Sequence, residues 1–341
     1  MVVRFLVFAY IFLGVFGTCF CFPDNARSSM QCPSIIVDLH LGEPVSLDVA
    51  LDDMAGAAVV YVGEYHTISR HHQFQADIMK GLAKRNGISG LAMEMFTTEQ
   101  QSLVDKWLES KDSVSELLQK LGPGAWNNLK DYESVLLMAR DLGIPIISLN
   151  APDSLVRKVS REGLESLPET ERKLLPEDIE PVNPDYSRLL SLKLRVHRAF
   201  EGKGLTRIIQ AQALRDAVMA SNIIQFLEKH PKANKPLMVI AGSGHINYGF
   251  GIPERVEKYV DASYRIILPS ESGELQLSEA EKKQAVEIDI SHEDVKFIGR
   301  PIADYLSVLP VESNDDETGG HHENVARIQR INSIDPRRHN D

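Results

Sequence analysis

The segment GEYHTISRHHQF, residues 63–74, holds the densest group of side chains that could do chemistry. It places Glu64, His66, His71 and His72 within nine residues of a chain that has 11 histidines in all. Histidine exchanges a proton near neutral pH, and a neighbouring carboxylate fixes its tautomer and supports its cation. The pattern favours acid/base groups or metal ligands, although the polar start of a surface helix would look the same.

Comparable residues follow other apolar runs. Glu94 ends the run ISGLAME, and a second Gly-x-x-His, from Gly242 to His245, begins at the last residue of PLMVIAG. Glycine permits a tight turn that would bring each histidine over the end of the preceding strand. In doubly wound sheets, ligands collect outside the carboxyl ends of the strands. We therefore expect four ionisable side chains to converge at one edge of a sheet: Glu64, His66, Glu94 and His245.

Two types of chemistry suit this set of residues. The four side chains could act as the catalytic acid/base groups of a hydrolase, or they could hold a divalent metal ion with open positions. The sequence contains no HExxH, CxxC pair or GxSxG, and it has no Gly-rich nucleotide loop. These absences argue against a standard zinc peptidase, zinc ribbon, α/β-hydrolase or nucleotide-binding site.

Helical spacing adds further polar candidates. One of the adjacent residues His71 and His72 can face inward with Gln75, while the other borders solvent. Gln212 and Asp216 are four residues apart on a long helical pattern and could project toward the same edge, although a solvated stripe has the same spacing. His197 shares a helical face with apolar residues, as a core histidine would.

The elements that must position these residues are short apolar runs separated by helical patterns. The runs cover residues 57–62, 88–94, 144–150, 236–242 and 264–269. Continuous apolarity indicates strands covered on both faces, so the sequence predicts an α/β fold with a mostly parallel sheet flanked by helices. Residues 151–204 contain no strand pattern and several prolines, which predicts a helical insertion that acts as a lid.

The ends of the chain differ from this core. Residues 1–24 contain an uncharged run, Phe5 to Phe22, which predicts a signal peptide or N-terminal membrane anchor and hence export; a lipobox-like Cys19 departs from the usual pattern. The α/β domain is expected at 25–270, and 271–341 form a C-terminal extension, largely disordered after 311. The net charge of −11 argues against nucleic acid as a partner.

Several blocks occur in an order that resembles the ChaN-like family of haem-binding proteins, within the Tiki and erythromycin-esterase-like superfamily. They are GEYHTISRHHQFQ, AMEMF, ISLNAP, QAQALRDAVMA and AGSGHINYGFGIPERV. The resemblance spans residues 36–268 and implies an exported or lipid-anchored α/β domain that binds haem and is linked to iron uptake. It also implies that four residues match the superfamily's site, where related enzymes carry out metal-dependent proteolysis or ester hydrolysis: Glu64, His66, Glu94 and His245.

The resemblance extends the haem pocket to further side chains. Haem ligation in the family involves tyrosine and histidine, for which Tyr65, Tyr186 and Tyr248 are the tyrosine candidates. The leading hypothesis is an exported haem-binding protein, with a homodimer left open, and the alternative is an ester or peptide hydrolase that uses the same cluster. The expected cofactor-binding residues are His66, His71, His72, Gln75, Tyr186, His197, Gln212, Asp216, His245 and Tyr248.

Overall fold

The computed structural model describes residues 35–173, 175–179, 182–194, 202–231, 234–270 and 292–308. All of them belong to one unit, which begins at Pro33. The predicted signal or anchor segment, His197 and the chain after residue 308 lie outside the described residues. Within the described residues, no helix has the length and apolar character needed to cross a membrane.

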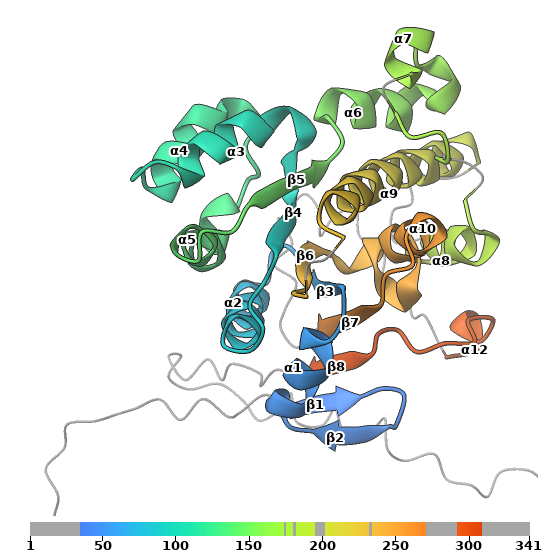
Figure 1. Ribbon diagram of the computed structural model, residues 1–341. Coiled ribbons are helices and arrows are strands. Elements are labelled where there is room, and N and C mark those ends of the chain that lie inside the picture. Colours follow the sequence, from blue (N-terminus) through green and yellow to red (C-terminus); the bar gives the residue numbers. More distant parts are fainter. Residues whose placement is uncertain are drawn as a thin grey trace, which may run out of the picture. The chain divides into compact units, whose positions relative to one another are not determined.

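A single sheet organises the described residues (Figure 1). Its strand order is β2-β1-β8-β7-β3-β6-β4-β5. The six strands from β8 to β5 pair in parallel, whereas β1 pairs antiparallel with β2 and β8. The bounds are β1 Ile35–Asp38, β2 Glu43–Val45, β3 Val59–Glu64, β4 Gly90–Thr97, β5 Ile146–Asn150, β6 Leu237–Gly242, β7 Tyr264–Pro269 and β8 Tyr305–Val308. The predicted α/β class with a mostly parallel sheet is confirmed.

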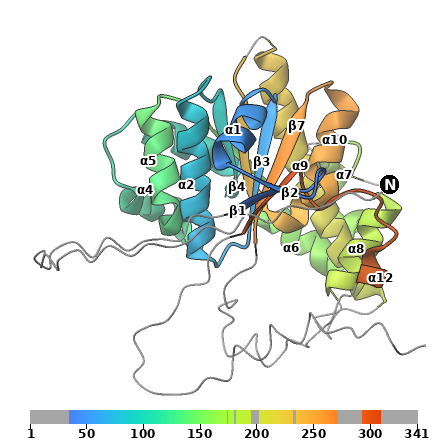
Figure 2. The same ribbon diagram turned by 90° about the horizontal axis from the view of Figure 1, so that it is seen from below.

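Helices cover both faces of the sheet, as Figure 2 shows. One layer contains α1 Leu47–Ala55, α2 Ser69–Ala83, α3 Gln101–Leu108, α4 Val114–Leu121 and α5 Glu133–Asp141. The opposite layer contains α9 Lys203–Lys229 and α10 Ile252–Tyr259. Short 3-10 turns connect these elements: η1 Thr98–Gln100, η2 Gly122–Gly124, η3 Leu129–Tyr132, η5 Ser243–His245 and η6 Asn247–Gly249.

Strand β3 explains why the central strands are continuously apolar. All of its residues are buried. Val60 and Val62 belong to the hydrophobic core under α2 and α5, whereas Val59 and Tyr61 belong to the core under α9 and α10. Because successive side chains point to opposite faces, a strand covered on both sides needs apolar residues at every position.

The described part of segment 151–204 consists of helices joined by turns and contains no strand. It contains α6 Asp153–Glu162, η4 Leu164–Ser166, α7 Glu169–Arg172 and α8 Pro184–Leu194. Val159 and Leu164 pack with Ala213 and Leu214 of α9 in a third hydrophobic cluster. The helical insertion is thus present, and its action as a lid stays a prediction.

The sheet extends beyond the end predicted for the domain. Strand β8 lies after residue 270, and a short helix, α12 His292–Val295, precedes it. Leu306 pairs with Leu268 of β7, so residues that the sequence assigned to a C-terminal extension contribute a strand to the sheet. The α/β domain therefore includes residues on both sides of that boundary.

Candidate functional site

The topology creates a crevice at the carboxyl edge of the sheet. Strand β3 continues into α2 on one face, whereas the neighbouring strand β6 leads to α10 on the other. Chain segments that leave adjacent parallel strands in opposite directions open a crevice for ligands. Glu64 is the last residue of β3, Gly242 is the last residue of β6, and Glu94 lies near the end of β4.

Glu64 is buried and held by three donors. Its Oε1 lies 2.5 Å from Nδ1 of His66 and also accepts a hydrogen bond from the hydroxyl of Tyr132. Its Oε2 accepts from Nε2 of Gln75 at 2.5 Å. Burial and the neighbouring Glu64 raise the pKa of Tyr132, which keeps this hydroxyl protonated as a donor. The three contacts fix the carboxylate in one orientation.

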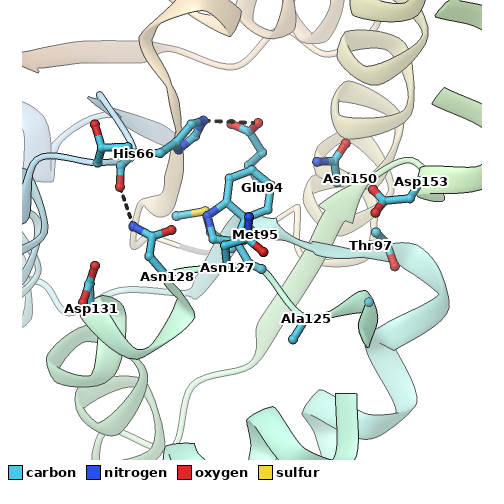
Figure 3. Close-up of a pocket in the computed structure, with 13 residues that line it drawn as sticks. His66, Glu94, Met95, Thr97, Ala125, Asn127, Asn128, Asp131, Asn150 and Asp153 are labelled. Atoms are coloured by element: carbon cyan, nitrogen blue, oxygen red, sulfur yellow. Dashed lines mark hydrogen bonds and ion pairs between the residues drawn. The ribbon is translucent and has the colours of Figure 1, made fainter. Parts of the chain in front are cut away.

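His66 lies between the carboxylates of Glu64 and Glu94 at the edge of the crevice, and Figure 3 shows its ring facing Glu94. Its Nε2 is 3.7 Å from Oε1 of Glu94, and its side chain is 32% exposed. Trp126 meets the ring edge-on, with centroids 4.9 Å apart, and Nδ2 of Asn128 donates to the His66 carbonyl at 2.5 Å. Burial disfavours the protonated ring, but the hydrogen bond to Glu64 and the charge of Glu94 outweigh it. The pKa of His66 is therefore raised.

Gly242 leaves the space that the His66 ring occupies. A Cβ atom on Gly242 would lie 2.8 Å from Nε2 of His66 and 3.4 Å from Oε2 of Glu94. Real Cβ atoms do not approach other atoms as closely as the first of these distances. The amide of Gly242 also donates to Oε2 of Glu94 at 2.6 Å. This glycine therefore positions both a histidine and a carboxylate.

His245 lies in a closed, charged environment. Its Nδ1 is 2.5 Å from Oδ1 of Asp216, and its Nε2 is 3.3 Å from Oε1 of Glu94. Burial disfavours its cation, but the charges of Glu94 and Asp216 outweigh burial and raise the pKa of His245 to about 9. Burial likewise disfavours the Glu94 anion, yet His245 and the guanidinium of Arg215 hold the pKa of Glu94 well below its usual value.

Side chains of α8 and α9 pack around His245 and its partner Asp216. The hydroxyl of Tyr186 lies 2.9 Å from Oδ2 of Asp216 and 3.0 Å from the Gly244 carbonyl. Nε2 of Gln212 lies 2.9 Å from Nδ1 of His245. Burial and the charge of Asp216 raise the pKa of Tyr186 well above its usual value. Tyr186 is buried, so its hydroxyl serves this internal network rather than an open surface.

The two adjacent histidines of α2 are both buried, so the expectation that one of them borders solvent is wrong. Nδ1 of His71 accepts a hydrogen bond from the Tyr65 amide at 2.9 Å. Its Nε2 lies 3.2 Å from the Ser270 carbonyl oxygen, which can only accept, so Nε2 carries the proton. His71 is thus a neutral ring with both nitrogens occupied, and burial lowers its pKa. His72 packs on Tyr132 with centroids 4.2 Å apart, and burial lowers its pKa too.

A cavity of about 540 Å³ opens in front of His66 and Glu94. Its wall includes the segment between η2 and η3, which covers the crevice from one side, and Asp153 at the start of α6. Asp153 is the only described residue of the predicted lid that lines the cavity. The lining residues are His66, Thr67, Glu94, Met95, Thr97, Gly124, Ala125, Trp126, Asn127, Asn128, Asp131, Asn150 and Asp153.

The structure brings together most of the residues that the sequence nominated. Of these, His66 and Glu94 line the cavity directly, while the others do not line it: Glu64, His71, His72, Gln75, Tyr186, Gln212, Asp216 and His245. Tyr248 lies apart, half-buried beside Phe250 with ring centroids 6.3 Å apart, and it does not line the cavity.

Sequence reasoning missed several contributors to the site. Trp126, Asn128 and Tyr132 come from the connection between β4 and β5, where no strand end or motif marks them. Arg215, which also hydrogen-bonds Asn150 at 3.1 Å, sits beside the nominated Asp216 on α9. A basic residue next to Asp216 on the same helical pattern is a candidate partner for the buried carboxylate of Glu94, and this signal could have identified Arg215.

The geometry does not support a metal site at the four predicted residues. Within the described part of the chain, no three or more His, Cys, Asp or Glu side chains are placed to hold a metal ion together. The physical reason is visible in the contacts. Both nitrogens of His245 face carboxylates, and the oxygens of Glu64 are occupied by protein donors.

Comparison with known proteins adds the following similarities. The family described as haem-binding uptake, Tiki superfamily, ChaN matches residues 50–256, more than half of the chain. A solved structure described as cofacial heme binding to ChaN of Campylobacter jejuni has a TM-score of 0.59 and 20% identity, covering 81% of this chain and 97% of that one. This likeness shows the fold.

Of two further similar proteins, one is much longer than this chain and the other has a lower TM-score. The chloroplastic protein RETICULATA-RELATED 5 of Arabidopsis thaliana is 24% identical over 247 residues, which are 67% of this chain and 34% of that protein. The chain thus spans about a third of this relative's length. A mutant erythromycin esterase in its open conformation has a TM-score of 0.41 at 13% identity, covering 65% of this chain and 72% of that one.

Proposed function

The chain belongs to the ChaN family of the Tiki superfamily, a haem-binding family, and on this premise we propose that it binds haem in the cavity in front of His66. The family match across residues 50–256 is the observation that carries the proposal. The cavity volume of about 540 Å³ supports it, because pockets for cofactors and small ligands span about 300–1,000 Å³.

The residues around the cavity fit an iron porphyrin. Met95, Ala125 and Trp126 offer apolar and aromatic surface, and His66 is the only histidine among the described lining residues. Histidines that ligate metals usually hold a carboxylate or carbonyl on their second ring nitrogen. Nδ1 of His66 has this contact with Glu64, so Nε2 would hold the iron in place of its 3.7 Å contact with Glu94. Bound haem would supply an iron centre for ligand or electron exchange.

The other buried histidines are less suited to this role. His71 uses one nitrogen as an acceptor and the other as a donor within the protein. His245 directs each nitrogen at a carboxylate, and its pKa of about 9 keeps the ring protonated near neutral pH. A protonated nitrogen has no lone pair for a metal. These contacts favour His66 as the residue that would hold the iron.

The test is a titration of the full chain with haem, followed by the Soret absorbance. Wild-type protein should give a saturable Soret shift, and His66→Ala should give a different Soret spectrum and bind at least about tenfold more weakly, in line with losses for a removed metal-site group. His230→Ala is the matched control, because His230 is exposed at the end of α9 and remote from the cavity. An unchanged spectrum in His66→Ala would refute the assignment of His66, and no shift in wild type would refute haem binding.

We also propose that the protein is exported and handles haem or iron outside the cytoplasm. The uncharged run from Phe5 to Phe22 supports export, and the description of the family as an uptake family supports the role. Fusion of residues 1–30 to a reporter that is active only outside the cytoplasm should give signal. A reporter that stays inactive inside the cell would contradict export.

A second candidate function is hydrolysis of an ester or peptide, favoured by the pair of Glu64 and His66 beside the cavity. A carboxylate on Nδ1 orients an imidazole so that Nε2 can take a proton from a nucleophile. Because the pKa of His66 is raised, the rate should increase as the pH rises through that pKa. The test is turnover of p-nitrophenyl acetate and labelled casein by haem-free protein; equal rates in wild type and His66→Ala would eliminate this candidate.

A further inference from the structure

A second cavity, of about 310 Å³, opens at the carboxyl edge of the sheet beside the ends of β3 and β7 and next to β8. In the strand order, β7 and β8 follow β3 on the side away from β4 and β5, beside which the first cavity lies (Figure 1). The two cavities share no described lining residue. The second one, which we call the β7 cavity, is therefore a separate space. Its volume falls within the range of small-ligand sites, about 300–1,000 Å³.

Aliphatic side chains line the β7 cavity on the side of β7 and β8. Leu268 and Pro269 end β7, Ile302 precedes β8, and Leu306 lies within β8. Leu306 pairs with Leu268, so both side chains stand on the same face of the sheet. Gly63 makes room for this arrangement, because a Cβ atom there would collide with the side chain of Leu268. An apolar molecule in the cavity would leave water for contact with this wall.

His71 fixes the opposite part of the wall. Its Nδ1 accepts a hydrogen bond from the Tyr65 amide, and its Nε2 donates to the Ser270 carbonyl. Tyr65 and Ser270 both line the β7 cavity, and the ring between them is fully buried. The ring therefore ties the end of β3 to the end of β7 and positions the cavity wall, a role that haem binding does not give it.

The hydroxyl of Ser243 has no hydrogen-bond partner among the described residues, although Ser243 is only 8% exposed and lines the β7 cavity. The neighbouring amide of Asn247 is occupied. In the orientation that satisfies both of its polar atoms, Nδ2 donates to the Ser243 carbonyl at 2.8 Å and Oδ1 accepts from Nζ of Lys193 at 3.1 Å. A secluded hydroxyl without a partner is costly, so the Ser243 hydroxyl calls for an acceptor from outside the protein.

The lining also sets the charge of a molecule that fits. No lysine or arginine occurs among the described lining residues of the β7 cavity, whereas buried Glu64 does. The oxygens of Glu64 are already engaged by His66, Gln75 and Tyr132. An anion would lose its hydration without meeting a cation, and a cation would meet a carboxylate that is already satisfied. A neutral molecule avoids both costs.

We propose that the β7 cavity is a second ligand site, which takes a neutral aliphatic molecule with one hydrogen-bond-accepting oxygen, such as a ketone. The hydrocarbon part would lie against Leu268, Ile302 and Leu306, and the oxygen would accept a hydrogen bond from the hydroxyl of Ser243. The inference goes beyond haem binding and does not depend on it, because different residues line the two cavities.

The experiment is equilibrium dialysis of the full chain against 2-heptanone. Wild-type protein should bind the ketone saturably, and Ser243→Ala should bind it about fivefold more weakly, the size of one net hydrogen bond. The matched ligand is 2-methyl-1-heptene, in which a methylene group replaces the carbonyl oxygen, and its affinity should be the same in both proteins. Ser102→Ala is the matched control, because Ser102 is exposed on α3 in the other helical layer.

Two further measurements test the charge and the place of binding. Heptanoate should bind at least about tenfold more weakly than 2-heptanone, because its carboxylate must lose water without gaining a cation. Ile302→Trp fills the cavity from its partly exposed wall and should abolish binding of the ketone and the alkene. In wild-type protein, 2-heptanone should shift the ring-proton NMR resonances of His71, whose partners line the cavity, and leave those of His230 unchanged.

The outcomes separate this inference from haem binding. Absence of saturable ketone binding, or wild-type affinity in Ile302→Trp, would overturn the β7 cavity as a ligand site. Equal affinity of Ser243→Ala and wild type for the ketone, or binding of heptanoate as tight as that of the ketone, would overturn the proposed ligand chemistry. Each of these results leaves the haem titration as it stands, because neither Ser243 nor Ile302 lines the cavity in front of His66.

Discussion

The two Gly-x-x-His segments have the same spacing, yet their histidines lie in opposite surroundings. Each ring has a carboxylate 2.5 Å from Nδ1 and directs Nε2 toward Glu94. The side chain of His66 is nevertheless 32% exposed on the cavity wall, whereas that of His245 is 5% exposed. The spacing sets where each ring points, but it does not set whether a ligand can reach it.

The covering elements account for the difference. Helices α8 and α9 bring Tyr186, Gln212 and Asp216 against His245 and close that side. On the other side, the connection between β4 and β5 brings Trp126 against the His66 ring and Asn128 against its carbonyl, and a cavity lies in front of the ring. We infer that His245 is a fixed cation that stabilises the site, while His66 is the group that meets a ligand.

The largest loss of stability should come from Glu94→Gln, which removes the anion that pairs with His245 on the closed side of the site. Buried His245 and partly exposed Arg215 would lose their shared partner. Removing one member of a buried ion pair costs about 3–5 kcal/mol, because the remaining charge stays buried without compensation. Urea denaturation should show this loss in the free energy of unfolding. Exposed Glu99→Gln is the control, and a loss for Glu94→Gln below about 1 kcal/mol would contradict the buried network.

The second prediction concerns how the free energy of unfolding depends on pH, to which the two histidines contribute differently. The folded pKa of His245 is about 9, above its ordinary value of 6.5, so its pairing stabilises the fold fully below pH 6.5. That contribution is lost as the pH rises through 9, and it amounts to at most about 3 kcal/mol. The raised pKa of His66 acts in the same direction. The free energy of unfolding should therefore decline between pH 6.5 and 9.

Variants assign this decline to one histidine. His66→Ala should keep most of it, whereas His245→Gln should flatten the curve. If His245→Gln is too unstable to measure, the ring-proton NMR resonance of His245 in wild-type protein should titrate well above 6.5. A resonance that titrates at or below that value would show that the carboxylates do not hold the ring as a cation.

The central part of the fold could be predicted from sequence because its strands are buried on both faces. The apolar runs at 57–62 and 236–242 correspond to β3 and β6, in which all residues are buried. Strands β1, β2 and β8 have three or four residues and partly exposed faces, so they lack that signal. The pairing of β1 with β8 joins residues far apart in the chain, such as Ile36 and Ser307, and local patterns do not encode such contacts.

The site was predictable where it depends on strand ends. The structure brings Glu64, His66, Glu94 and His245 together at the carboxyl edge, while their roles in binding or catalysis stay predictions. Burial was harder to foresee, because it depends on which helix covers which residue. Trp126, for example, reaches His66 from a connection that carries no motif of its own.

A smaller loss of stability should follow from Gly242→Ala, which tests how His66 is positioned on the open side of the site. The new Cβ would start 2.8 Å from Nε2 of His66, so the ring must move. Inserting a methyl group into a packed position costs about 1–3 kcal/mol, and the half-exposed ring can relax into the cavity, which favours the lower end. The His66 NMR resonance should shift, and haem affinity should fall. Gly244→Ala is the control, since its nearest atom outside the loop lies at 4.0 Å. Equal behaviour of the two variants would show that Gly242 does not position His66.

The smallest change in stability should come from His66→Ala. The variant loses one hydrogen bond to Glu64, but Tyr132 and Gln75 still donate to that carboxylate, and water in the adjoining cavity can replace the lost donor. A hydrogen bond to a charged group contributes about 1.5–3 kcal/mol when its partner is left unsatisfied. With water available, we expect a loss of about 1 kcal/mol in the free energy of unfolding, below that of Glu94→Gln in the same urea assay. A loss as large as that of Glu94→Gln would mean that both histidines serve the fold equally, and the distinction between an open and a closed half would no longer hold.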